Sequence, residues 1–361
     1  MKVAIITPYF LQATTGNGVT VARIRGNLSA CGADVKVFSL DESSPSEIAA
    51  SLKRFSPDVI HAFHSLRCGP LASSLSGELD RPFIVTITGT DLYRDVATSS
   101  GIAEQDVLAK ASAIVTFQQA IKERVSALFP PSAGKVTVIP QGVELPGSPV
   151  DEQQSEANFT FLLPAGIRPV KNVLFPFRPL AALNLKNPQV RLVIVGPPID
   201  PAYSEEVSKA VRANPFSSWA GEVPHSGMPQ LYRSAGVVLN TSLSEGGMAN
   251  SLLEGMAHQR PVLASAVEGN RFLEDGVTGL LYSGEAEFMQ KAERLILDGS
   301  LRKKLGEAGR GYLLENCSPE IEAGRYMELY ERVIECRFAT KFTDLIQPEQ
   351  MAPSKKGSGG H

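Results

Sequence analysis

Short runs of aliphatic and β-branched residues alternate with longer stretches of helical periodicity along almost the whole chain. Apolar runs of about four to eight residues between turn signals are typical of strands buried on both faces. Their alternation with helices predicts repeated βαβ units and parallel sheets. In the first half, the expected strands are residues 3–7, 34–38, 59–62, 83–88, 113–117 and 135–139. In the second half, they are residues 160–163, 191–195, 237–240, 261–264 and a short strand near 279–282.

The stretches between these strands show the helical pattern, for example at residues 19–31, 46–55, 102–110 and 119–129. A polar segment that contains proline and glycine, residues 144–156, separates the two halves and predicts a linker. Each half restarts with a strand, so we expect two Rossmann-like α/β domains that meet near residue 150. The predicted units are residues 1–150, residues 151–317, an amphipathic helix within 318–340 and a disordered tail at 341–361.

The bulk composition restricts the class of protein. The chain has 361 residues, of which 43% are hydrophobic and 20% charged, as in ordinary globular proteins of two domains. A net charge of −3 argues against nucleic acid as a partner. No apolar run approaches the roughly 20 residues of a membrane span, and the start lacks the apolar region of a signal peptide. The four cysteines lack CxxC or metal-like spacing, which predicts free thiols, a cytoplasmic location and no metal site.

The segment 244–254 has the most informative pattern. Glu245 follows the expected strand 237–240, Gly246 and Gly247 form a turn, and a helical stretch carries Glu254. Glycines let the backbone approach a ligand closely, and the free N–H groups at a helix start favour an anion. A carboxylate can accept hydrogen bonds from two hydroxyl groups. Together these features predict a site for a polyol and a phosphate, in preference to an ordinary strand–turn–helix crossing.

Two further loops carry candidate chemistry. Arg168 and Lys171 follow the first strand of the second half, where two cations can converge on a diphosphate and stabilise it as it leaves. Gly16, Asn17 and Gly18 lie between the first strand and the first helix. This glycine pair lacks the third glycine and the acidic residue of the dinucleotide fingerprint. An NAD-dependent oxidoreductase would share the α/β layout, but the sequence does not carry its fingerprint.

The segment 244–254 resembles the double-glutamate signature of retaining glycosyltransferase family 4, which has the GT-B fold of two Rossmann-like domains facing across a cleft. In that family, the first glutamate contacts the donor sugar and the second binds the ribose of the nucleotide. The resemblance assigns these roles to Glu245 and Glu254. Eight residues separate them, one more than is usual, and we assign the extra residue to the Gly246–Gly247 turn.

The resemblance also covers the other loops, and it is strongest from residue 161 to 282. It implies that Arg168 and Lys171 form the basic pair that holds the diphosphate, and that the helix from 318 to 340 returns to the first domain. Many members have a histidine where Thr88 stands; Asp91 keeps its family position on the acceptor side, and His61 and His64 lie on a neighbouring strand end. The remaining residues that the resemblance assigns to the nucleotide-sugar site are Gly16, Asn17, Gly18, Val223, His225, Gly246, Gly247, Met248, Ala249 and Asn250.

The predicted activity is transfer of a hexosyl or N-acetylhexosaminyl group from a nucleotide sugar, most simply a UDP-sugar, with retention and without a metal or cofactor. Two subgroups are similar in particular runs: the bacterial selenosugar synthases, whose acceptor is selenophosphate, and the glycosyltransferase 1 domain-containing proteins. The acceptor is thus selenophosphate or another small metabolite. Thr88 and the longer glutamate spacing keep a second hypothesis open, a nucleotide-sugar-binding protein without transferase activity.

Overall fold

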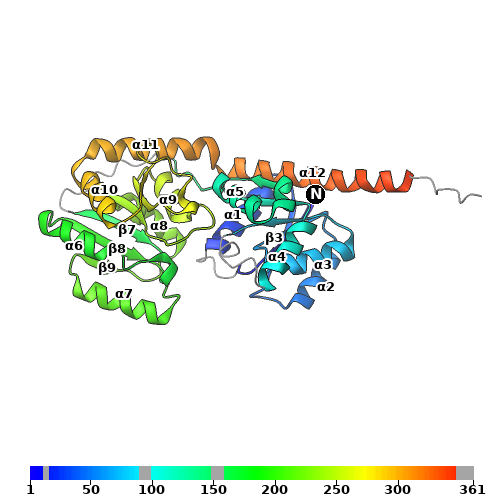
Figure 1. The fold of residues 1–361 in the computed structure, drawn as a ribbon, viewed down its shortest axis with the longest axis horizontal. Helices are drawn as coiled ribbons and strands as arrows, with labels where there is room; N and C mark the ends of the chain where they lie inside the picture. The colour runs from blue at the N-terminus through cyan, green and yellow to red at the C-terminus, as the bar shows by residue number, and fades with distance from the viewer. Residues whose placement is uncertain (11–15, 89–98, 148–157, 347–361) are drawn as a thin grey trace, which may run out of the picture.

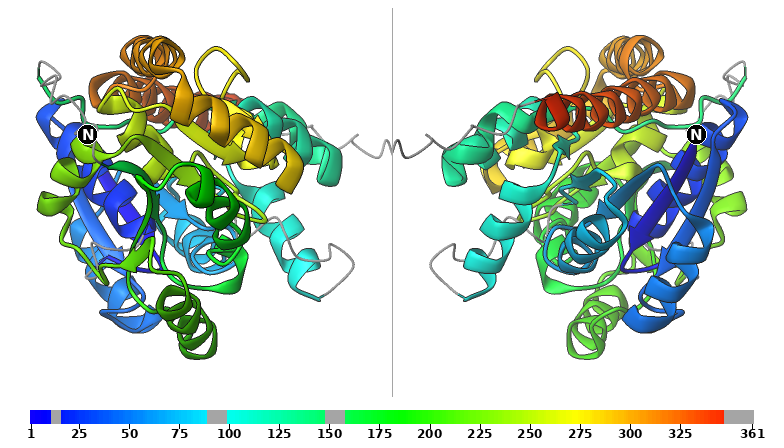
Figure 2. Two further views of the ribbon diagram at one scale, coloured as in Figure 1. Left: turned by 90° about the vertical axis from the view of Figure 1, so that its left-hand side faces the viewer. Right: turned by 90° about the vertical axis from the view of Figure 1, so that its right-hand side faces the viewer.

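Two six-stranded parallel sheets, each covered by helices on both faces, make up the protein (Figures 1 and 2). The computed structural model describes residues 1–10, 16–88, 99–147 and 158–346. The first sheet has the order β2-β1-β3-β4-β5-β6, and the second has the order β12-β11-β10-β7-β8-β9. The strands of the first sheet are β1 (Lys2–Thr7), β2 (Asp34–Ser39), β3 (Val59–Phe63), β4 (Phe83–Thr86), β5 (Ala113–Thr116) and β6 (Val136–Val138). Those of the second are β7 (Phe159–Pro164), β8 (Val190–Val195), β9 (Ser217–Trp219), β10 (Val237–Asn240), β11 (Val262–Ser265) and β12 (Leu280–Tyr282).

The helices cover the two faces because successive strand residues point to opposite sides. In β1, Ala4 and Ile6 enter one core while Val3 and Ile5 enter another. The first half contains α1 (Gly16–Ala30), α2 (Pro45–Phe55), α3 (Gly69–Leu79), α4 (Ser99–Lys110) and α5 (Gln119–Leu128). The second contains α6 (Phe177–Lys186), α7 (Pro201–Ala213), α8 (Met228–Ser234), α9 (Asn250–Ala257), α10 (Glu285–Leu297), α11 (Gly299–Asn316) and α12 (Pro319–Ile346). The described residues also form the 3-10 helices η1 (Pro130–Lys135), η2 (Pro169–Lys171), η3 (His225–Gly227) and η4 (Glu268–Asn270).

The α/β class with two parallel sheets is confirmed, and the differences from the predicted elements are local. Strand β9 was not predicted, because Ser217–Trp219 is a short, partly exposed edge strand without an apolar run. Helix α1 begins at Gly16 instead of residue 19, because Gly16, Asn17 and Gly18 are poor helix formers without an apolar pattern that would mark them as helical. Helix α12 continues to Ile346, beyond the expected end at residue 340. Residues 148–157 of the expected linker region and 347–361 of the expected tail lie outside the described residues.

Helix α12 lies along the first sheet although it follows α11 of the second half (Figure 1). Tyr326 and Tyr330 of α12 are completely buried in the same core as Val3 and Ile5 of β1. His61 of β3 is buried against this helix, with 2.7 Å from Nδ1 to the Tyr330 hydroxyl. Burial lowers the pKa of His61 to about 3, so the imidazole is neutral. Among the described helices, none is long and apolar enough to span a membrane.

The order of the second sheet identifies where a ligand can enter. The chain moves from β7 to β8 and β9 on one side, then returns to place β10 on the other side of β7. In open parallel sheets, ligands bind outside the carboxyl ends of the strands at such a switch point. The loops that follow β7 and β10 contain residues 165–172 and 241–249. These are the loops that carry the basic pair and the first glutamate.

Candidate active site

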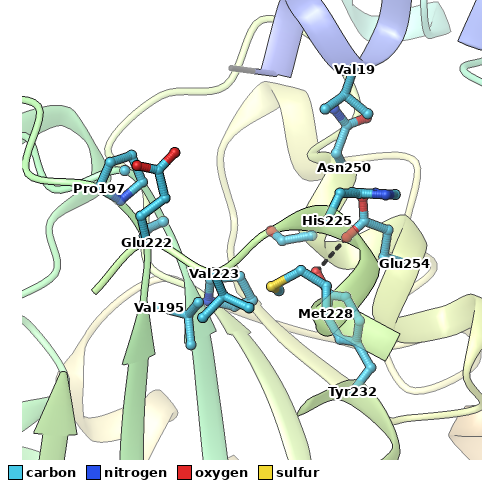
Figure 3. Close-up of a pocket in the computed structure, with 15 residues that line it drawn as sticks. Val19, Val195, Pro197, Glu222, Val223, His225, Met228, Tyr232, Asn250 and Glu254 are labelled. Atoms are coloured by element: carbon cyan, nitrogen blue, oxygen red, sulfur yellow. Dashed lines mark hydrogen bonds and ion pairs between the residues drawn. The ribbon is translucent and has the colours of Figure 1, made fainter. Parts of the chain in front are cut away.

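A pocket lies at the carboxyl ends of β7 and β8, against the first turns of α9 (Figure 3). Val19 of α1 lines it from the first half of the chain, so the two halves share this pocket. The residues that line it are Val19, Pro164, Ala165, Gly166, Val195, Gly196, Pro197, Glu222, Val223, His225, Met228, Tyr232, Asn250, Ser251 and Glu254. The amides of the first turn of a helix attract anions, and Asn250 and Ser251 begin α9.

Glu254 is held by two side chains in this pocket. The Tyr232 hydroxyl donates a hydrogen bond of 2.7 Å to Oε2, and His225 Nε2 lies 3.3 Å from Oε1. Tyr232 is buried, and burial together with the negative charge of Glu254 raises the pKa of the phenol, so it remains a donor. The hydrogen bond with Glu254 raises the pKa of His225 against the effect of its partial burial. The carboxylate is therefore oriented before any ligand arrives.

The opposite wall of the pocket is formed by backbone, short apolar side chains and the Glu222 side chain (Figure 3). The Trp219 indole donates a hydrogen bond of 3.0 Å to the Gly196 carbonyl and closes the far side of this wall. Gly196 has φ +149°, and a Cβ there would collide with the Ala165 backbone. Val195 and Val223 lie beside it (Figure 3). The result is a slot with a mainly apolar wall that bears Glu222 on one side and the Glu254 carboxylate on the other.

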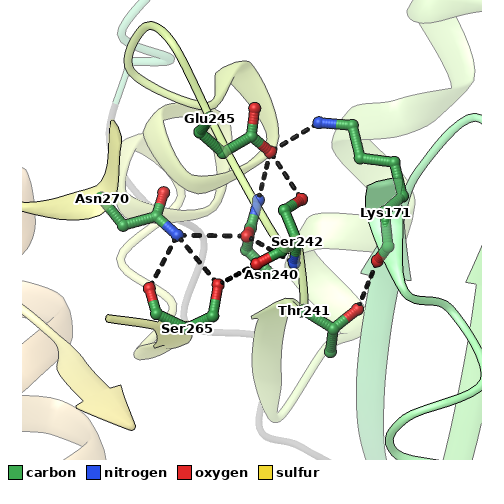
Figure 4. A network of polar contacts seen from close by, with 7 residues as sticks. All are labelled: Lys171, Asn240, Thr241, Ser242, Glu245, Ser265 and Asn270. Atoms are coloured by element: carbon green, nitrogen blue, oxygen red, sulfur yellow. Dashed lines mark hydrogen bonds and ion pairs between the residues drawn. The ribbon is translucent and has the colours of Figure 1, made fainter. Parts of the chain in front are cut away.

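Glu245 lies in a separate, mostly buried polar cluster (Figure 4). Its Oε1 atom accepts hydrogen bonds from Lys171 Nζ at 2.5 Å, Ser242 Oγ at 2.7 Å and Asn240 Nδ2 at 3.0 Å. Burial opposes the charged form, but the charge of Lys171 and the three donors outweigh it and lower the pKa of Glu245. The Asn270 amide donates to Asn240 Oδ1 at 3.1 Å and so supports this cluster from behind. Glu245 is thus an ionised carboxylate in a prepared polar environment.

The loop after β7 joins the pocket to this cluster. Gly166 lines the pocket, whereas Lys171, at the end of η2, pairs with Glu245. The Thr241 hydroxyl donates to the Lys171 carbonyl at 2.8 Å and fastens the two loops of the switch point together. Arg168 is exposed at the start of η2. The loop therefore offers cationic groups between the pocket and an ionised carboxylate.

The glycine turn and the start of α9 lie against the first half of the chain. Met248 and Ala249 are buried in a core cluster with Phe117, so only their backbone is left for a ligand. A Cβ on Gly247 would lie 2.8 Å from the Phe117 ring. Asn250 Oδ1 accepts a hydrogen bond of 2.6 Å from Gln141. Gly246 is buried in the same turn.

The predicted residues of the first half are placed less completely. Gly16, Asn17 and Gly18 form the first turn of α1, directly before Val19 of the pocket. Asp91 lies outside the described residues. His64 is buried after β3 with φ 83°, and Thr88 is half-buried after β4.

Sequence reasoning missed Tyr232, Trp219 and Gln141. Tyr232 is an aromatic residue on a short helix, and such a residue normally indicates only a core position. It fills a core position here, but its hydroxyl also binds Glu254. The sequence carried no signal for Gln141, because its partner Asn250 lies 109 positions away.

Comparisons with known proteins agree with this geometry. Residues 15–142 match the glycosyl transferase 4-like domain, and residues 158–298 match the glycosyl transferases group 1 family. Glycosyltransferase 1 domain-containing protein 1 of Xenopus tropicalis is 29% identical over 334 residues, covering 88% of this chain and 95% of that protein. A glycosyltransferase from Rickettsia africae has a TM-score of 0.76 at 17% identity, covering 92% of this chain and 99% of its own. Anabaena HepE in complex with UDP has the same TM-score and identity, covering 92% of this chain and all of its own. The chain is therefore a glycosyltransferase with the GT-B fold, in which a glycosyl transferase 4-like domain precedes a group 1 glycosyl transferase domain.

Proposed function

We propose that the protein is a retaining, metal-independent glycosyltransferase that takes its sugar from a UDP-sugar and passes it to a small acceptor such as selenophosphate. The observation that carries this proposal is that two carboxylates, each already held by hydrogen bonds, lie at the same switch point of the second sheet. Glu254 faces the slot, and Glu245 lies with Lys171 on the adjoining loops. The related fold of Anabaena HepE, whose crystal structures contain UDP and UDP-glucose, supports the choice of nucleotide.

In this proposal, the nucleotide occupies the slot. The base lies against the apolar wall near Val195 and Val223, and the ribose hydroxyl groups donate to the Glu254 carboxylate. The diphosphate meets the first amides of α9, where the helix dipole favours negative charge. Lys171 and Arg168 supply positive charge to the same group, so the chain's own cations neutralise the diphosphate as it departs. Residues 1–150 then form the acceptor domain and residues 151–317 the nucleotide-sugar domain.

In this proposal, Lys171 and Glu245 exchange each other for parts of the donor when the donor binds. The diphosphate competes for the Lys171 ammonium, and the sugar hydroxyl groups replace that ammonium as donors to Glu245. During transfer, the bond between the sugar C1 and the phosphate oxygen breaks as the acceptor attacks C1 from the same face. The departing phosphate oxygen takes the proton of the acceptor, which accounts for retention without a protein nucleophile. Negative charge grows on the diphosphate in this step, and Lys171 stabilises it.

The experiment that tests the proposal compares Glu254→Gln with Glu245→Gln by calorimetric titration of UDP and of UDP-glucose. An amide replaces one acceptor oxygen with a donor, so Glu254→Gln loses or reverses one ribose hydrogen bond. A hydrogen bond to a charged group contributes about 1.5–3 kcal/mol, so binding of both ligands should weaken ~10- to 100-fold. Glu245→Gln should not weaken free UDP, because it frees the Lys171 ammonium for the diphosphate, and should weaken only the sugar-bearing ligand.

The reverse pattern would overturn the assignment. If UDP affinity falls for Glu245→Gln and not for Glu254→Gln, the longer spacing has exchanged the two roles. Donor turnover in the presence of a chelator tests the chemistry separately. Loss of turnover that Mg²⁺ restores would contradict a metal-independent mechanism.

A further inference from the structure

The two halves of the protein meet along a seam next to the polar cluster around Glu245. We define the seam as the contacts of Phe117, Gln118, Arg124 and Gln141 with the second half. Phe117 and Gln141 abut the glycine turn after Glu245, while Gln118 and Arg124 contact η4. The proposed function assigns no role to these four side chains.

Gln118 begins a continuous path of contacts that ends at Glu245. Its Nε2 atom donates a hydrogen bond of 2.8 Å to the Gly269 carbonyl. Gly269 packs so closely on the Glu245 backbone and Cβ that it leaves no room for a side chain. The next residue, Asn270, donates to Asn240 Oδ1 at 3.1 Å, and Asn240 Nδ2 donates to Glu245 Oε1 at 3.0 Å. Helix η4 therefore contacts the backbone of Glu245 directly and reaches its carboxylate through Asn240.

The path is rigid because its members are enclosed. Gln118 is 6% exposed, Asn240 is 5% exposed and Asn270 is completely buried. Asn270 is fixed further by a hydrogen bond of 3.0 Å to the Ser265 carbonyl. Buried side-chain amides in such a network have few alternative partners, so a shift of η4 changes the position of Glu245.

We propose that Gln118 is a positioning residue that orients Glu245 through η4, so that the donor sugar is held correctly only while the two halves touch. This inference rests on the proposed function, in which Glu245 contacts the donor sugar. A residue of the acceptor-side half then controls capture of the sugar in the other half. Transfer is thereby coupled to contact of the two domains, and premature hydrolysis of the donor is disfavoured.

The same loop offers a matched control. Arg124 Nη1 forms an ion pair of 2.8 Å with Glu268 Oε2, one position before Gly269, and both side chains are about one-third exposed. This pair also holds η4, but it is partly exposed and acts one position before the Gly269 carbonyl, so it should contribute little to the position of Glu245. If these substitutions act only by loosening the contact between the halves, the Gln118 and Arg124 variants should have similar effects. If Gln118 positions Glu245, the Gln118 variant should have the larger effect on binding of the donor sugar.

The test uses Gln118→Met, Arg124→Met, Glu245→Gln and the double variant Gln118→Met/Glu245→Gln. Calorimetric affinities for UDP and UDP-glucose are measured with the full chain, together with kcat for release of UDP from UDP-glucose. One neutral hydrogen bond is lost at Gln118, so UDP-glucose should bind about 3- to 10-fold more weakly while UDP binding stays unchanged. The kcat should fall by a similar factor, and Arg124→Met should change none of these values beyond about twofold.

The double variant separates the possible failures. If Gln118 acts through Glu245, adding Gln118→Met to Glu245→Gln should cause no further loss of UDP-glucose affinity. Additive losses, equal losses for UDP and UDP-glucose, or the same effect from Arg124→Met would overturn the inference. If Glu245→Gln itself does not weaken UDP-glucose relative to UDP, the proposed function fails instead. Should the methionine variant lose its fold, Gln118→Leu removes the donor without burying a charge and gives the same test.

Discussion

The ion pair between Arg23 of α1 and Glu322 of α12 makes a quantitative prediction about how the last helix is held. Arg23 Nε and Nη2 each lie 2.9 Å from a different Glu322 oxygen, and the two side chains are only 8% and 1% exposed. Glu322→Ala leaves the guanidinium buried without its carboxylate. Removing one partner of a buried pair costs about 3–5 kcal/mol, since the remaining charge stays desolvated. We expect the free energy of unfolding to fall by that amount.

A second ion pair on the same helix provides the control. Arg337 Nη2 lies 2.7 Å from Asp80 Oδ1, but the side chains are 41% and 50% exposed. Exposed pairs contribute about 0–1 kcal/mol, so Asp80→Asn, which removes the charge but still suits the left-handed backbone at φ 54°, should be nearly neutral. Both variants delete one carboxylate that contacts α12, and they differ mainly in burial.

The assay is urea unfolding followed by far-UV circular dichroism, with the variants compared at a common slope of free energy against urea. The two losses should differ by about 3 kcal/mol. A cost for Glu322→Ala below about 1 kcal/mol, similar to that of Asp80→Asn, would refute the reasoning. It would mean that burial of apolar surface, for example at Tyr326, holds α12 in place. The attraction within the ion pair would then only offset the cost of desolvating its two charges.

Three other variants test separate parts of the structure. Burial lowers the pKa of His61 from 6.5 to about 3, so between these pH values the unfolded chain binds a proton that the folded chain does not. The wild-type protein should therefore lose about 2 kcal/mol of its free energy of unfolding at this residue between pH 7 and pH 5. In His61→Asn, urea unfolding should show a pH-dependent loss that is smaller by this amount. Lys171→Ala should lower kcat ~10²- to 10³-fold and change UDP affinity much less, whereas an unchanged kcat with a raised KM would show that Lys171 only binds. Gly247→Ala places a methyl group 2.8 Å from the Phe117 ring and should lower kcat by spreading the seam, while Gly77→Ala, with open space around it, should leave kcat unchanged; equal kcat values would contradict the close contact.

The local pattern of the sequence determined the α/β class and most of the strands. Alternation of apolar runs with helical periods depends only on residues near one another in the chain, and such patterns predict elements well. Parallel strands bring their carboxyl ends to one edge of the sheet, which places the loops of Glu245 and Lys171 side by side. The short edge strand β9 escaped detection because partly exposed strands lack an apolar run.

Tertiary structure decided the partners of the site residues. Lys171 and Glu245 are 74 positions apart, and Gln118 and Gly269 are 151 positions apart, so no local pattern reports these contacts. The burial of Glu254 beside Tyr232 likewise depends on how α8 packs against α9. Hydrogen bonds in a protein are short and directional, so they follow from the exact placement of whole elements. The sequence thus determined which chemical groups reach the switch point, while packing of the two halves determined which of them are paired, buried and oriented.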